Sequence, residues 1–124
     1  MADNKATIER LLAGINRGDI SVMDEVFHED ALMDWPQFGE RVRGAENRRN
    51  IYKRIPMLPK VKVRRVFGGG DLWIAEVVLD YEGAKFNTAF LFEFRDGKIA
   101  RETGYWATPG APADWRAQWV ERLE

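Results

Sequence analysis

The chain has 124 residues, and its 45% hydrophobic and 31% charged content is typical of a folded globular domain rather than a disordered segment. The 19 basic and 20 acidic residues are spread along the chain, so it lacks the basic stripe of nucleic-acid-binding proteins, and no apolar run could span a membrane. The absence of cysteine and the single histidine, His28, exclude disulfides, thiolate chemistry and a histidine-rich metal site.

The first half of the chain is predicted to form three helices and one short strand. An apolar stripe with helical spacing marks the first helix: Ile8, Leu11, Leu12 and Ile15. Ser21 is a suitable N-cap for a short second helix, and residues 31–35 are predicted as a short strand that Pro36 ends. The third helix is predicted over residues 44–55, because Pro56 disfavours a helical conformation in the residue before it.

The second half is predicted to form an antiparallel meander. β-branched and aromatic residues fill 72–81, and the apolar residues of 86–94 alternate with polar ones. Asp96-Gly97 is the strongest short-range hairpin signal, which makes 99–106 the last strand. An earlier strand begins near Val61, and its alternation slips at Arg65–Val66, which indicates either a bulge or the end of the strand.

Helices that precede a run of strands predict an α+β fold with helices packed on one face of a curved antiparallel sheet. We find no repeat or linker, so residues 1–124 are predicted to form a single domain. The outward side of the strands is too apolar for a fully wet surface, which predicts a homodimer through it: Ile74, Val78, Leu91 and Tyr105. Alternatively, a closing helix with Trp115, Trp119 and Leu123 at helical spacing covers that face.

Four segments at the predicted turns carry a resemblance to a known family: Asn16-Arg17-Gly18-Asp19, Phe27-His28-Glu29-Asp30-Ala31, Arg41-Val42-Arg43-Gly44 and Phe94-Arg95-Asp96-Gly97-Lys98-Ile99. With them the chain resembles the nuclear transport factor two-like superfamily, and within it the SnoaL-like polyketide cyclase group, from about residue 5 to about residue 106. The resemblance implies a cone of helices and sheet with an internal pocket, and a homodimer formed through the outer sheet face. Turn and capping residues indicate a fold and little chemistry.

Two enzymes of this superfamily have catalytic groups where the present chain is apolar. The tyrosine and two aspartates of ketosteroid isomerase correspond to Leu12, Trp35 and Phe90. The catalytic positions of limonene epoxide hydrolase correspond to Val77, Leu79 and Gly104. The resemblance therefore implies neither of these two mechanisms.

Strand alternation predicts which side chains face the helices, and hence the lining of a pocket. If Phe90 and Phe92 face the helices, then Glu102 and Trp106 do so from the next strand. Together with residues from the helical half, the predicted ligand pocket is rich in aromatic groups: Trp35, Arg48, Tyr52, Trp73, Val77, Phe90, Phe92 and Trp106. The alternative interpretation is that these side chains fill a closed core.

Glu102 is the candidate catalytic residue. A carboxyl in an apolar pocket has a raised pKa, which suits a general acid or base near neutral pH. A close ion pair with Arg48 would instead lower the pKa and indicate a structural role. Gly68-Gly69-Gly70 lacks the lysine and the helix of a phosphate-binding loop, so we expect no nucleotide, metal or other cofactor.

Three functions stay open at this point. The first is a cofactor-independent enzyme of isomerase, cyclase or hydrolase type, acting on an apolar or polyketide-like molecule by general acid/base catalysis. The second is a non-catalytic module that binds a hydrophobic ligand, and the third is a protein-interaction domain. We expect a small apolar molecule and a second copy of the chain as partners, neither nucleic acid nor membrane, and a cytoplasmic location.

Overall fold

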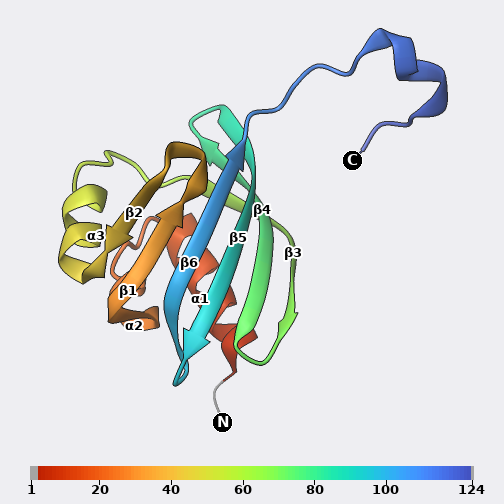
Figure 1. Ribbon diagram of the computed structural model, residues 1–124. Coiled ribbons are helices and arrows are strands. Elements are labelled where there is room, and N and C mark those ends of the chain that lie inside the picture. Colours follow the sequence, from red (N-terminus) through yellow and green to blue (C-terminus); the bar gives the residue numbers. More distant parts are fainter. Residues whose placement is uncertain (1–2, 124) are drawn as a thin grey trace.

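The computed structural model describes residues 3–123 and shows a curved sheet wrapped around helices (Figure 1). The helical elements are α1 (Asn4–Asn16), α2 (Val22–Val26), α3 (Gly44–Tyr52) and the 3-10 turns η1 (Pro36–Phe38) and η2 (Asp114–Trp119). The strands are β1 (Phe27–Trp35), β2 (Glu40–Arg43), β3 (Lys60–Gly69), β4 (Leu72–Tyr81), β5 (Ala84–Arg95) and β6 (Lys98–Ala107). Within residues 3–123, no helix is long and apolar enough to cross a membrane.

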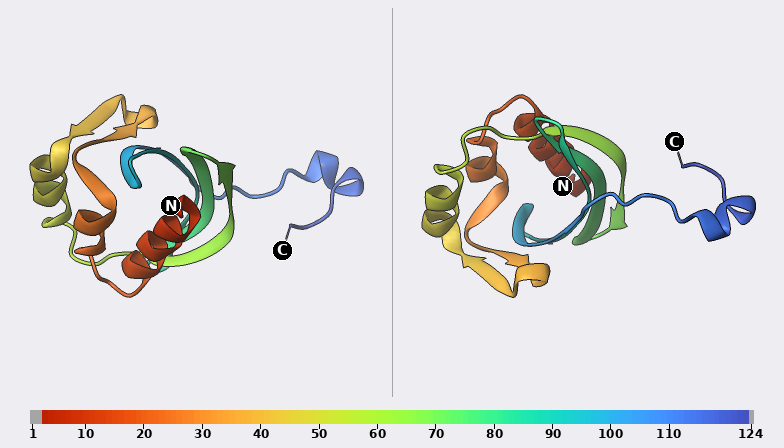
Figure 2. Two further views of the ribbon diagram at one scale, coloured as in Figure 1. Left: turned by 90° about the horizontal axis from the view of Figure 1, so that it is seen from below. Right: turned by 90° about the horizontal axis from the view of Figure 1, so that it is seen from above.

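The sheet is open and mixed, with the strand order β2-β1-β6-β5-β4-β3. Neighbouring strands are antiparallel except β1 and β6, which run parallel. The views along the cone show α1 on the concave side of the sheet (Figure 2). The predicted α+β fold with a curved sheet around helices is confirmed, and the β1–β6 pair makes the sheet mixed instead of purely antiparallel.

The meander in the second half follows the sequence pattern closely. β4, β5 and β6 are consecutive antiparallel strands, as predicted. Asp96 and Gly97 both have positive φ, 50° and 79°, which a two-residue turn between twisted strands requires. The β3–β4 register shifts between Val63 and Arg65, where the alternation of the sequence slips. Of the two alternatives for this slip, the structure shows the bulge, because β3 continues to Gly69.

The first half departs from the predictions in its boundaries. β1 begins at Phe27 instead of Ala31, and α3 ends at Tyr52, before the predicted end at residue 55. Ser21 occupies the N-cap position of α2 as predicted, but its side chain makes no capping hydrogen bond to the helix. Its backbone N–H and its hydroxyl both donate hydrogen bonds to the Asp19 carboxylate. Asp19 thus organises this turn, since a carboxylate is the stronger acceptor.

The predicted closing helix is also wrong. Residues 114–119 form a 3-10 turn that stands away from the sheet, and the outer sheet face is not covered by it (Figures 1 and 2). Trp115 and Trp119 are 76% and 71% exposed. Their helical spacing alone did not produce a helix, because most helical stability in proteins comes from packing an apolar face.

The core lies between α1, α2 and the concave face of the sheet. Its largest fully buried side chains come from all of these elements: Phe92, Ile8, Ile99, Val22, Val26 and Val77. Gly14 in α1 permits the close approach of α2, because a Cβ there would lie 2.6 Å from a methyl carbon of Val22. This contact fixes the two helices over one end of the sheet.

Gly14→Ala tests this contact. Helix propensity alone predicts a gain of about 1 kcal/mol, whereas overpacking against Val22 typically costs about 1–3 kcal/mol. We expect a net loss in the free energy of unfolding, measured by urea denaturation, and recovery in the double variant Gly14→Ala/Val22→Ala. A Gly14→Ala variant more stable than the wild type would contradict the close packing.

Candidate active site

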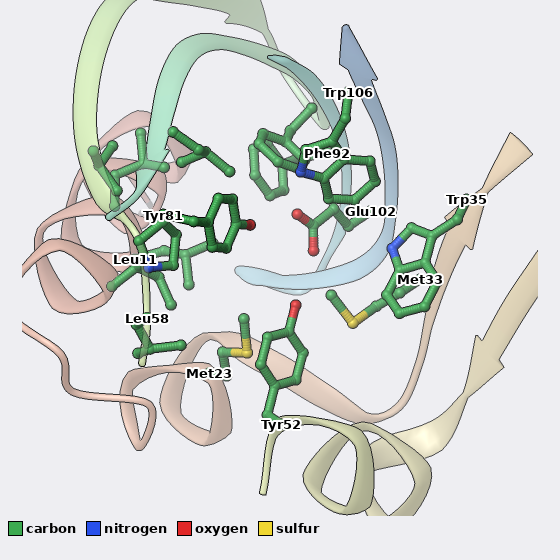
Figure 3. Close-up of a pocket in the computed structure, with 16 residues that line it drawn as sticks. Leu11, Met23, Met33, Trp35, Tyr52, Leu58, Tyr81, Phe92, Glu102 and Trp106 are labelled. Carbon is green, nitrogen blue, oxygen red and sulfur yellow. The ribbon is translucent and has the colours of Figure 1, made fainter. Parts of the chain in front are cut away.

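A cavity of about 60 Å³ lies between the concave face of the sheet and the helices (Figure 3). Because one water molecule needs roughly 10–15 Å³ by this measure, the cavity can hold several waters or part of a ligand. Its lining is predominantly apolar: Leu11, Leu12, Ile15, Met23, Met33, Trp35, Tyr52, Leu58, Pro59, Val61, Leu79, Tyr81, Phe90, Phe92, Glu102 and Trp106.

The cavity borders a wider hollow of about 410 Å³ where β6 ends. The outer hollow adds Phe38 and other residues of the rim, and the two share six lining residues: Trp35, Tyr52, Leu58, Pro59, Tyr81 and Trp106. We call the outer one the vestibule. A ligand too large for the inner cavity can therefore extend outward between aromatic side chains.

Glu102 places a carboxyl in this apolar cavity. It pairs with Phe92 across β5 and β6, and only 8% of its surface is exposed. Its Oε2 is buried and has no hydrogen-bond partner among the described residues. Loss of hydration raises the pKa of Glu102 to about 8, against the opposing effect of the Arg48 charge. This carboxyl can therefore gain or lose a proton near neutral pH.

Two tyrosine hydroxyls point toward the Glu102 carboxyl, one from α3 and one from β4 (Figure 3). Burial raises the pKa of Tyr52 far above its usual range, and the negative charge of Glu102 adds to that effect. Burial also raises the pKa of Tyr81, although a hydrogen bond with the Trp106 side chain opposes the rise. Both phenols therefore stay protonated and can donate hydrogen bonds into the cavity.

Arg48 does not pair with Glu102. Its Nη2 donates a hydrogen bond of 2.7 Å to Oδ1 of Asp24, and its guanidinium lies 5.2 Å from the centroid of the Phe27 ring. The side chain is buried behind the cavity and does not line it. Because Asp24 pairs with the charge of Arg48, loss of hydration is the dominant effect on the pKa of Glu102.

Five of the predicted lining residues surround the same cavity as Glu102: Trp35, Tyr52, Phe90, Phe92 and Trp106. Arg48, Trp73 and Val77 lie elsewhere. Trp73 donates a hydrogen bond of 2.9 Å from Nε1 to the carbonyl of Gly70, beside the β3–β4 turn, and Val77 is fully buried in the core. Alternation along a strand predicts the face of a residue but not its depth in the cone.

Several lining residues were absent from the predicted set. Tyr81 follows Leu79 by two positions, so the same alternation could have found it. Leu58 and Pro59 lie in the irregular segment between α3 and β3, which has no period to reveal their orientation. The methionines Met23 and Met33 carry no signal that distinguishes a pocket from a core.

Trp106 lines both the inner cavity and the vestibule. Its ring is 5.4 Å from Phe90 and 6.2 Å from Trp35, edge to face in both pairs. A Cβ on Gly104 would lie 3.0 Å from the nearest atoms of the Phe90 and Trp106 rings, so a side chain there would push these rings out of their present positions. The backbone N–H of Trp106 donates a hydrogen bond of 2.7 Å to Gln37, which holds β6 to η1.

The other polar candidates have structural partners. Asp34 accepts hydrogen bonds from Arg41 and Arg101, which hold the pKa of its carboxyl at about 2. His28 is hydrogen-bonded through Nε2 to the carbonyl of Arg95. No group of three or more histidine, aspartate or glutamate residues within 3–123 is arranged to hold a metal ion.

The raised pKa of Glu102 predicts a pH-dependent stability. The folded state holds this proton more tightly, so stability falls as pH rises from the unfolded value near 4.5 to the folded value of about 8. Glu102→Gln removes the cost of the buried charge. We expect the variant to match the wild type near pH 4 and to exceed it at pH 9 by on the order of 5 kcal/mol in urea melts, from a pKa raised from 4.5 to about 8. Parallel pH profiles for the two proteins would show that Glu102 titrates as an exposed carboxyl.

The chain is similar to known proteins along nearly all of its length. The family model of the SnoaL-like domain matches residues 8–102. An NTF-2 like protein from Burkholderia xenovorans LB400 has 33% sequence identity and a TM-score of 0.90, with 98% of this chain and 95% of that chain covered. No curated protein matches the chain.

Two further structures have the same fold at lower identity. A proposed ketosteroid isomerase from Kribbella flavida DSM 17836 has 21% identity and a TM-score of 0.85, covering 98% of this chain and 90% of that chain. An LEH-like epoxide hydrolase from M. tuberculosis has 21% identity and a TM-score of 0.72, covering 83% and 81%. The family match over residues 8–102 and the shared fold lead to one assignment: the chain belongs to the SnoaL-like family of NTF2-like proteins.

Proposed function

We propose that this protein is a cofactor-independent enzyme that moves a proton on a small, apolar, polyketide-like molecule carrying a carbonyl group, with Glu102 as its general acid/base. The observation that carries the proposal is a buried carboxyl in a cavity, with one oxygen lacking a partner. A buried acceptor without a hydrogen bond is costly, so a bound molecule that satisfies it gains affinity.

The polar groups of the cavity suit proton abstraction next to a carbonyl. The ionised Glu102 takes a proton from that carbon, and its raised pKa makes it a stronger base than an ordinary carboxylate. Negative charge then develops on the carbonyl oxygen, which the hydroxyls of Tyr52 and Tyr81 stabilise as hydrogen-bond donors (Figure 3). In a β,γ-unsaturated ketone the enolate is a dienolate, and Glu102 returns the proton to its γ-carbon as the carbon–carbon double bond shifts into conjugation and the carbonyl re-forms, which completes an isomerisation.

The comparisons support this class of reaction, because neighbours of the same fold are proposed or described as an isomerase and an epoxide hydrolase. The positions that correspond to ketosteroid isomerase's catalytic groups, Leu12, Trp35 and Phe90, all line the cavity here and are apolar. We infer that this chain carries its acid/base group on β6 instead, at Glu102.

The test is deuterium exchange at carbons next to a carbonyl, followed by proton NMR in D₂O over a panel of cyclic and aromatic ketones. We expect exchange of at least one ketone to increase with pH up to about 8, as Glu102 ionises. Glu102→Gln should abolish it, and Tyr52→Phe should slow it roughly 100-fold through loss of one donor.

Glu93→Gln is the matched control, because Glu93 lies on the neighbouring strand β5 with an exposed carboxyl on the outer face. Its exchange rate should equal that of the wild type. Exchange that survives in Glu102→Gln at the wild-type rate would remove Glu102 from the mechanism.

A non-catalytic ligand-binding module is the second candidate, and the vestibule favours it. Its residues Phe38, Ile55 and Phe86 extend the apolar lining outward and add no further acid or base. Ketones that bind equally well to the wild type and to Glu102→Gln by calorimetry, without exchange in either, would support this function over catalysis.

A further inference from the structure

The C-terminal arm, residues 108–123, has no place in the site described above. It leaves the body at the end of β6 and carries η2 at a distance from the sheet (Figures 1 and 2). Its large apolar side chains are among the most exposed of the described residues: Trp115 at 76%, Trp119 at 71%, Val120 at 52% and Leu123 at 86%. An apolar group of this size at a surface typically marks an interaction site.

The arm lies on the convex side of the sheet, opposite α1 (Figure 2). The convex face carries an apolar row across three strands, Phe67, Ile74 and Leu91, which are direct neighbours in register. The arm and this face together bound a hollow of about 630 Å³, to which Leu123 contributes from the arm and Tyr105 from β6. The arm and the face thus form one concave surface open to another molecule.

We propose that the arm binds a second copy of this chain, with Trp115 and Trp119 packed on the convex sheet face of the partner and the exchange made reciprocally. In a two-fold symmetric dimer, the arm of each copy packs on the convex sheet face of the other copy, so the two contacts are identical. The convex face offers ion pairs beside its apolar row, Arg65–Glu76 at 2.8 Å and Arg101–Glu93 at 3.7 Å.

The arm matches this face in charge as well as in apolar character. Asp114 and Arg116 flank Trp115, and the Arg116 guanidinium lies 5.8 Å from the centroid of its ring. An acid, an aromatic ring and a base thus follow one another. The mixed charges beside the apolar row of the convex face can pair with these groups, and no like-charged surfaces need to meet.

The buried area is sufficient for a stable dimer. Each tryptophan can bury roughly 150–250 Å², so two arms offer on the order of 600–1,000 Å² from tryptophan alone. The surfaces that receive them lose a similar area, which brings the total to the ~1,200–2,000 Å² of specific interfaces.

Sedimentation equilibrium of the full chain tests the proposal. We expect a dimer at micromolar concentration, and a dissociation constant at least about 100-fold higher for Trp115→Ser/Trp119→Ser, because buried tryptophans dominate interface energies. Both side chains are exposed in the single chain, so far-UV circular dichroism should show an unchanged fold. Met57→Ser is the control, because Met57 is a large apolar residue outside the arm that is 57% exposed, and the dissociation constant of this variant should equal that of the wild type.

A photo-crosslinking group at position 119 distinguishes a reciprocal arm exchange from other contacts. In a mixture of isotope-labelled and unlabelled chains, we expect crosslinks between chains, to peptides of residues 60–107. A monomeric wild type, a double variant with the wild-type dissociation constant, or crosslinks only within one chain would each overturn the proposal.

Discussion

The pairing of Phe92 with Glu102 across β5 and β6 brings an acidic side chain onto the apolar face of the sheet. The Asp96-Gly97 turn pairs Phe94 with Ile99, and a register shift of one residue between Glu93 and Phe94 then brings Phe92 opposite Glu102. The apolar positions hold this register, since a slip of one residue would turn Phe92 outward. The packing of the whole concave face therefore offsets the free-energy cost of desolvating the Glu102 carboxyl. That cost is what makes Glu102 chemically different from the exposed carboxyls of the chain.

The sequence pattern predicts those parts of the fold that depend on neighbours along the chain. Alternation and the Asp96-Gly97 signal were sufficient for the antiparallel strands β4, β5 and β6. The slip at Arg65–Val66 marked an irregularity in β3 but did not distinguish a bulge from the end of the strand. The sequence pattern was insufficient where contacts between distant segments determine the position of a side chain. Whether Arg48 would reach Glu102 or Asp24 depends on how α2 and α3 pack, and no local period contains that information.

The candidate site, like the fold, was predicted where local sequence pattern decides and missed where position in the whole structure decides. Trp35, Phe90 and Trp106 have orientations that follow from alternation and from the family resemblance, and they meet in the structure. Trp73 has the correct face but lies near the other end of β4, because alternation carries no information on position along the cone axis. In the C-terminal arm the prediction of the element itself failed, because apolar residues at helical spacing form no α-helix when they have no surface to pack on.

The parallel pair β1–β6 has a consequence for the order in which this molecule can fold. Its contacts join residues far apart in the chain, such as Asp34 with Arg101 at a separation of 67 and Gln37 with Trp106 at 69. Contacts of such separation form slowly, because a long loop must close first. During synthesis, the wall that Trp35 and Trp106 share is incomplete until β6 has left the ribosome. The meander β3–β6, held by hairpin contacts, can assemble first and serve as the template onto which β1 docks.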